Sequence, residues 1–175
     1  MPQRLPEIIE IDRVGADGAV YSGEILLSRL PRIRNVMVEA RGTGKIELGL
    51  RRESQSCLVL SGMISATVLL ECQRCLDPFE CCLGTQVDCD IIRPMDEERR
   101  ARDAYTVDQD GILNVYELIE GELLLQLPVV PKHKEPRHCN QAMLQRAVEY
   151  VPGKEGSEQG YPRQHPFAVL KDLKN

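Results

Sequence analysis

Aromatic residues are scarce in this 175-residue chain, which has no Trp, two Phe and five Tyr. The hydrophobic core must therefore be built from aliphatic side chains, which an overall hydrophobic content of 42% can supply. Proteins that hold unpaired nucleic-acid strands stack the bases on aromatic rings. The shortage of rings thus argues against a stand-alone binder of single-stranded RNA.

Long apolar runs and an export signal are also missing. No run approaches the roughly 20 apolar residues that span a bilayer, and the first ten residues lack a basic segment followed by an apolar one. The seven cysteines are an odd number, which disfavours a complete disulfide framework. These features predict a cytoplasmic protein with reduced thiols and no membrane association.

Net positive charge is absent too, because the formal net charge is -5. Proteins that bind nucleic-acid phosphates are usually basic, so contact with RNA would require a local basic patch or an intermediary protein. Cations outnumber acids between residues 29 and 52, and acids outnumber cations between 96 and 124. Both stretches are equally well explained as solvated faces. The basic stretch supplies these candidate binding residues: Arg29, Arg32, Arg34, Arg41, Lys45, Arg51 and Arg52.

Apolar and polar residues alternate over several stretches, which predicts half-buried, antiparallel strands. The longest are 58–70, with apolar even positions, and 79–91, with apolar odd positions. A short connection separates these two stretches, so a hairpin is expected. Shorter alternations predict further strands at 36–41 and 45–50. The pattern favours the α+β class, with a sheet that is mostly antiparallel.

One packed helix is predicted near 114–127. Asn114 can cap its first turn, apolar residues recur at helical spacing, and Pro128 ends the run. The predicted organisation is a single α+β domain at 1–150 with a surface loop at 95–110 and a short helix at 140–150, a flexible linker at 151–165, and a C-terminal tail helix at 166–175.

Cys72 and Cys75 form a C-x-x-C motif in the turn of the predicted hairpin. Two thiolates at this spacing can bind one cation, and zinc in structural sites takes four nitrogen or sulfur ligands. His133 and Cys139 follow the predicted helix and can complete a structural zinc site, with His138 as a competing imidazole. The alternative interpretation is that the thiols stay reduced and pack as small hydrophobic groups.

Catalysis has little support in the sequence. Redox C-x-x-C motifs lie at a helix N-terminus, which lowers the thiol pKa, whereas this motif lies between two strands. The chain has no glycine-rich phosphate loop and no G-x-S-x-G motif. We expect Glu117, Glu120 and Glu122 to form a solvated helix face and not a general-base site.

Three stretches together resemble a known family. They are Glu71-Cys72-Gln73-Arg74-Cys75 with Pro78-Phe79, the acidic-to-aliphatic run from Tyr116 through Leu127-Pro128 to His133 that continues to His138-Cys139, and Pro166-Phe167-Ala168-Val169-Leu170 with Leu173-Lys174. In this order they resemble the YceD family of large ribosomal RNA subunit accumulation proteins.

The resemblance implies a factor for the synthesis, processing or stability of large-subunit ribosomal RNA that acts by binding and not by catalysis. Its implied partner is ribosomal RNA or the precursor of the large subunit, reached directly or through a ribosomal protein or a processing enzyme. The family has no established enzymatic activity, which favours a stabilising role for Cys72 and Cys75. The alternative function is a zinc- or thiol-dependent redox enzyme centred on these two cysteines.

Overall fold

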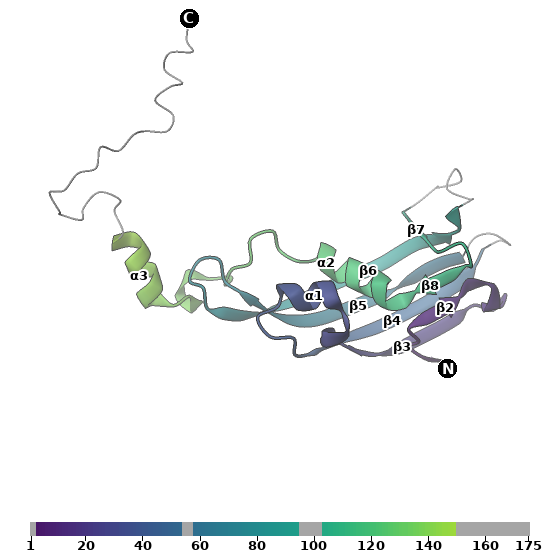
Figure 1. The fold of residues 1–175 in the computed structure, drawn as a ribbon, viewed down its shortest axis with the longest axis horizontal. Coiled ribbons are helices and arrows are strands. Elements are labelled where there is room, and N and C mark those ends of the chain that lie inside the picture. The colour runs from purple at the N-terminus through teal and green to yellow at the C-terminus, as the bar shows by residue number, and fades with distance from the viewer. Residues whose placement is uncertain (1–2, 54–57, 95–102, 150–175) are drawn as a thin grey trace, which may run out of the picture. The chain divides into compact units, whose positions relative to one another are not determined.

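The computed structural model describes residues 3–53, 58–94 and 103–149 (Figure 1). The chain divides into two units, Met1–Asn140 and Gln141–Asn175, and helix α3 is the described part of the second. The elements in chain order are β1 (Gln3–Arg4), β2 (Ile8–Glu10), η1 (Ile11–Arg13), β3 (Ala19–Leu26), η2 (Leu27–Arg29), α1 (Pro31–Val36), β4 (Thr43–Arg52), β5 (Leu58–Glu71), β6 (Pro78–Ile92), β7 (Ala104–Thr106), β8 (Ile112–Asn114), α2 (Val115–Leu125), η4 (Pro136–His138) and α3 (Gln141–Glu149).

A six-stranded sheet, in the order β1-β3-β4-β5-β6-β7, is the main layer of the first unit. The long strands β3 to β6 pair antiparallel, while the short strands β1 and β7 pair parallel with β3 and β6. β5 and β6 form the predicted hairpin, in register from Leu58–Ile91 to Glu71–Pro78. The predicted α+β class with a mostly antiparallel sheet is therefore confirmed.

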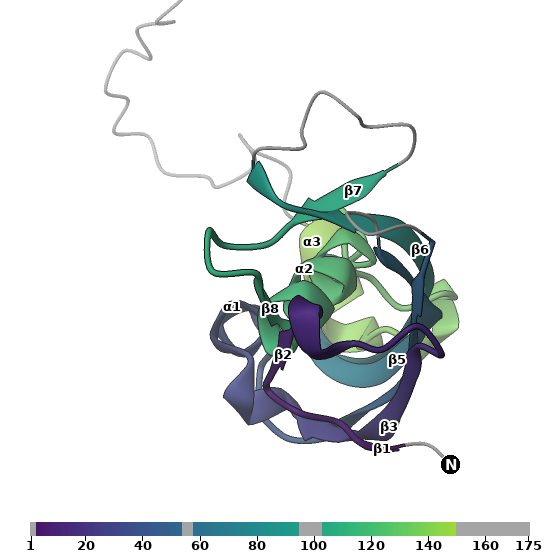
Figure 2. The ribbon, with the colours of Figure 1, turned by 90° about the vertical axis from the view of Figure 1, so that its right-hand side faces the viewer.

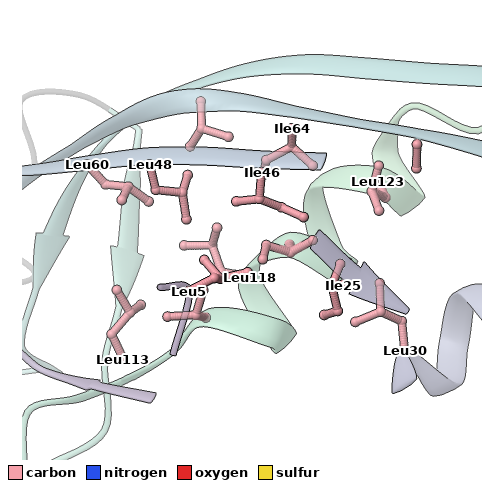
Figure 3. Close-up of a cluster of buried hydrophobic side chains, with 14 of the residues drawn as sticks. Leu5, Ile25, Leu30, Ile46, Leu48, Leu60, Ile64, Leu113, Leu118 and Leu123 are labelled. Carbon is pink, nitrogen blue, oxygen red and sulfur yellow. The ribbon is translucent and has the colours of Figure 1, made fainter. Parts of the chain in front are cut away.

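The core lies between the concave side of this sheet and α2. Figure 2 shows the strands curving around the helix, and Leu118, Ile119 and Leu123 of α2 are at most 3% exposed. Their neighbours from the sheet are aliphatic (Figure 3), and no aromatic side chain is fully buried among the described residues. The residues labelled in Figure 3 are Leu5, Ile25, Leu30, Ile46, Leu48, Leu60, Ile64, Leu113, Leu118 and Leu123.

Helix α2 begins where the sequence predicts. The Asn114 side chain accepts a hydrogen bond from the backbone N–H of Glu117 at 3.1 Å, which satisfies a donor that the first turn leaves free. The helix ends at Leu125, before Pro128. The predicted helix at 140–150 is likewise present, as α3.

The strand predicted at 36–41 is wrong. Pro31–Val36 forms the short helix α1, and irregular chain follows it. Pro31 favours a helix start because its ring fixes φ and it has no N–H to leave unpaired. The carboxylate of Glu120 accepts hydrogen bonds from the backbone N–H groups of Arg32 and Ile33 at 2.6 and 3.2 Å. A side chain from α2 thus caps α1.

Glu120 also corrects the prediction of a solvated acidic face on α2. Glu120 is 4% exposed, and its second carboxylate oxygen accepts a hydrogen bond from Nε of Arg32 at 2.8 Å. Glu117 is exposed and Glu122 is half-buried. The α2 acids therefore have different roles, and one of them joins two helices.

Several predicted segments lie partly or wholly outside the described residues. The linker at 151–165 and the tail helix at 166–175 are outside them, so the division at residue 150 stays a prediction. Of the predicted loop at 95–110, the described part contains the short strand β7, and Gly111 follows it with a φ of +73°. No helix in the described ranges has the length and apolar character to cross a membrane.

Candidate metal centre

The turn between β5 and β6 is a tight knuckle around Cys72. The backbone N–H of Cys72 donates to the carbonyl of Asp77, and the N–H of Leu76 donates to the carbonyl of Cys72, at 2.9 and 2.8 Å. Leu76 has a φ of +65°, which is uncommon for a residue with a side chain. The surroundings must hold this conformation in place, and the residues Cys72 and Cys75 are 0% and 1% exposed inside the turn.

The segment after α2 crosses this knuckle and brings in the other two predicted ligands. The backbone N–H of Gln73 donates to the carbonyl of Pro131 at 2.8 Å. This bond places His133 and Cys139 beside the turn, and the four ligand atoms of Cys72, Cys75, His133 and Cys139 lie within 4.8 Å of one another. The structure thus brings together the set that the sequence predicts. His138 lines the wall of a neighbouring groove.

The spacing of the donor atoms fits a zinc ion. Nδ1 of His133 lies 3.6 Å from Sγ of Cys75 and 3.6 Å from Sγ of Cys139. Zn–S bonds of about 2.3 Å and Zn–N bonds of about 2.0–2.1 Å at tetrahedral angles give an S–N edge of about 3.6 Å. Three sulfurs and one imidazole nitrogen are a common donor set of structural zinc sites.

The polar groups of the knuckle favour a thiolate at Cys72. Burial raises the pKa of this thiol, but hydrogen bonds from the backbone N–H groups of His133, Arg74 and Cys75, and from the His133 ring, outweigh burial and lower the pKa to about 6. Burial and the neighbouring sulfurs raise the pKa of Cys139. A cation would allow all three sulfurs to ionise together, because metal binding displaces thiol protons.

Other cysteines fit the alternative interpretation, in which thiols pack as small hydrophobic groups. Burial, followed by the nearby carboxylates of Glu122 and Asp90, raises the pKa of Cys89 to about 12. Cys81 is half-buried on the same face of β6, and burial raises its pKa as well. These two thiols stay protonated at neutral pH, in contrast to Cys72. The described cysteines form no disulfide.

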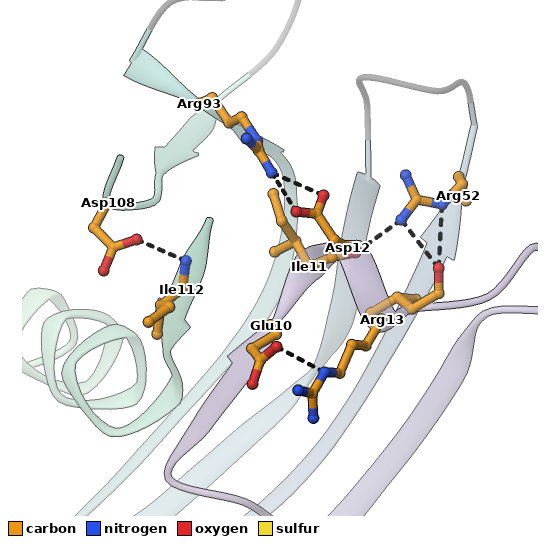
Figure 4. Close-up of polar contacts among 9 residues, drawn as sticks. Glu10, Ile11, Asp12, Arg13, Arg52, Arg93, Asp108 and Ile112 are labelled. Atoms are coloured by element: carbon orange, nitrogen blue, oxygen red, sulfur yellow. Dashed lines mark hydrogen bonds and ion pairs between the residues drawn. The ribbon is translucent and has the colours of Figure 1, made fainter. Parts of the chain in front are cut away.

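The predicted basic stretch is distributed over both sides of the sheet. Arg32 pairs with Glu120 on the concave side, whereas Lys45 alternates with the inward residues of β4 and points to the convex side. Most of the cations already have partners. Arg29 binds Glu7 and Tyr116, Arg41 binds Glu39, and Arg51 binds Glu53. Arg52 donates hydrogen bonds to the backbone carbonyls of Ile11 and Val14 (Figure 4). Arg34 and Lys45 are exposed and have no ion-pair partner in the described part of the chain. Binding by these seven residues stays a prediction.

The sequence did not reveal a groove beside the metal centre. Residues 79–82 of β6 and the segment 128–138 line a space of about 800 Å³. The ring of Phe79 contacts that of His133, with ring centroids 5.1 Å apart. The two walls are about fifty residues apart in the chain, so no local pattern could have indicated the groove.

The fold and the site define an α+β protein with one long β-hairpin, a helix in the concave side of the sheet, and a Cys3His cluster at the hairpin turn. Residues 60–174 match the family model described as Large ribosomal RNA subunit accumulation protein YceD, and the chain belongs to this family. A protein of Haemophilus influenzae with that same description is 26% identical over 157 residues, covering 88% of this chain and 87% of that protein. No solved structure matches the chain. The matched range contains all four residues of the cluster.

Proposed function

We propose that this protein supports the accumulation of large-subunit ribosomal RNA in the cytoplasm, by binding a component of the maturing subunit and not by catalysis. The family match over 60–174 carries this proposal, because it spans the hairpin, α2 and the Cys3His cluster. The partner is ribosomal RNA or the large-subunit precursor, contacted directly or through a ribosomal protein or a processing enzyme.

The Cys3His cluster would hold a structural zinc ion in this function. The S–N distances of 3.6 Å and the low pKa of Cys72 support zinc binding. The ion would fasten the segment 128–139 to the hairpin turn, in addition to the Gln73–Pro131 hydrogen bond and the Phe79–His133 ring contact. Zinc would then act by keeping a binding surface rigid.

Arg34 and Lys45 are the strongest of the seven candidates for contacts with phosphate groups, because both are exposed and neither is paired among the described residues. A double variant, Arg34→Gln with Lys45→Gln, should weaken association with RNA and flatten its dependence on salt. The matched control is Arg41→Gln with Arg51→Gln, which removes the same charge from side chains that already pair with Glu39 and Glu53. An equal effect of both pairs would indicate unspecific electrostatics.

The main test compares cells with and without the protein. Loss of the protein should lower the ratio of large- to small-subunit ribosomal RNA, and the tagged protein should sediment with large-subunit precursors at low salt. An unchanged ratio, together with no association at low salt, would remove the proposed function.

A thiol-dependent redox enzyme is the second candidate, favoured by the low pKa of Cys72. The motif's place in a turn between two strands argues against it, because redox C-x-x-C motifs lie at a helix N-terminus. Zinc content and disulfide-reductase activity of Cys72→Ser and Cys75→Ser separate the two. Loss of zinc together with loss of fold indicates a structural site, whereas lost turnover in a folded variant indicates an enzyme.

A further inference from the structure

Among the described residues, strand β6 has an open edge along most of its length. β5 pairs with Pro78–Ile91, whereas β7 pairs only with Asp90–Ile92. The N–H of Asp90 donates to the carbonyl of Asp103, on the side away from β5. Backbone groups alternate in direction along an antiparallel strand, so the other even-numbered residues of β6 also point to the open side. They are Glu80, Cys82, Gly84, Gln86 and Asp88, and their N–H and C=O groups have no backbone partner in the described ranges.

The groove beside the metal centre runs against this edge. One wall is the start of β6, and the other is the segment 128–138, which stands across from it. Phe79, Cys81 and Val130 make the groove partly apolar. An exposed edge strand is a ready template for another strand, and proteins usually cover or interrupt such edges. A wall facing an open edge instead leaves a slot in which one extended chain can lie.

Charges near the far end of the edge indicate which chain would fit. The carboxylates of Asp88, Asp90, Asp103 and Glu122 all lie close enough to Cys89 to raise the pKa of its thiol. Asp90 is 9% exposed, and one of its carboxylate oxygens is buried without a hydrogen bond from the described residues. The described carboxylates therefore make this end of the edge acidic, and Lys or Arg side chains would complement it.

We infer that the free edge of β6 binds an extended segment of a basic protein by strand addition. Backbone hydrogen bonds to the even-numbered residues of β6 provide affinity, small apolar side chains enter the groove beside Phe79, and Lys or Arg side chains face the carboxylates around Asp88. This inference goes beyond the proposed function, because it rests on the edge, the groove and the charges alone.

Gly84 allows a matched pair of variants. A Cβ at this position meets no atom within 4 Å, so Gly84→Ala should leave the edge intact. Gly84→Pro removes an N–H that points to the open side and places a ring there, without removing a bond to β5. The probe is a capped nonapeptide of alternating Val and Arg, titrated into the full-length protein by calorimetry.

We expect wild type and Gly84→Ala to bind the peptide alike, and Gly84→Pro to bind at least about tenfold more weakly. Asp88→Lys should weaken binding as well. A peptide N-methylated at every second residue should bind wild type at least about tenfold more weakly, because it lacks the donors that strand addition needs. On binding, the amides of Glu80, Cys82, Gly84 and Gln86 should gain protection from hydrogen exchange.

Equal binding by the proline and alanine variants, or by the plain and methylated peptides, overturns the inference. The methylated peptide decides the matter even if Gly84→Pro fails to fold. If the protein forms a dimer that Gly84→Pro disrupts, the edge binds a second copy of the chain. If a twelve-nucleotide oligouridylate competes with the peptide, the edge binds RNA. Either result overturns the inference. Normal ribosomal RNA levels with Gly84→Pro leave the proposed function intact, so the two can fail separately.

Discussion

The cap that Glu120 provides for α1 should be a major source of local stability. Glu120→Ala leaves the backbone N–H groups of Arg32 and Ile33 without their acceptor, and Ile33 is 0% exposed. An unsatisfied buried donor costs about 1–3 kcal/mol, so the free energy of unfolding should fall by about 2–4 kcal/mol. The Arg32 guanidinium is largely exposed and water can replace its partner, so the ion pair adds little.

Urea unfolding, followed by far-UV circular dichroism, measures this loss. The matched control is Glu117→Ala on the same helix, whose exposed side chain should change the unfolding free energy by less than about 0.5 kcal/mol. Glu120→Gln should lie between the two, because its amide oxygen can still accept both backbone bonds, which share Oε1, whereas its NH2 group cannot accept from Nε of Arg32. A loss below about 1 kcal/mol for Glu120→Ala would refute the capping role and would indicate that α1 forms without it.

Three further outcomes are expected. Cys139→Ser should lower bound zinc, measured by mass spectrometry, from about one ion per chain to well below one, whereas Cys82→Ser, an exposed thiol outside the cluster, should not. Gly62→Ala should destabilise the fold by about 1–3 kcal/mol in urea, because its Cβ would overlap backbone atoms of β4, whereas Gly49→Ala, whose Cβ meets only ordinary contacts, should cost less. In metal-free, reduced protein, the lowered pKa of Cys72 contributes to the free energy of unfolding; this contribution is fully present above pH 9 and is lost as the pH falls through 6. The Cys72→Ser variant should lack this pH dependence. Parallel profiles of unfolding free energy against pH for wild type and Cys72→Ser would contradict the prediction.

Patterns in the sequence were sufficient to predict the helices and strands that are determined by interactions between residues close together in the chain. Alternation over 58–70 and 79–91 predicted β5 and β6, since a strand exposes its two faces in turn. Asn114 predicted the start of α2, because its side chain bonds an N–H only three residues away. β3 showed no such alternation, because small residues such as Gly23 occupy its inner face and pack against the N-terminal chain.

The prediction at 36–41 failed although this segment lies beside β5, where the N–H of Val38 donates to the carbonyl of Leu69 at 2.9 Å. Helix α1 contains the segment's first residue, Val36. The start of α1 depends on Pro31 and on the buried carboxylate of Glu120, 88 positions from Arg32. The same contact placed Glu120 inside the protein, where helical spacing alone predicted an exposed face.

The amino-acid sequence by itself determined the strands of the hairpin, the helix that packs on them, the C-x-x-C turn and the family, because these depend on residues that are near one another in the chain. Tertiary structure decided which imidazole joins the thiols, which cations are already paired, and where β6 keeps an open edge. The first depends on chain segments 58 residues apart, which the Gln73–Pro131 hydrogen bond brings together. The other two depend on how the strands and helices pack around the sheet.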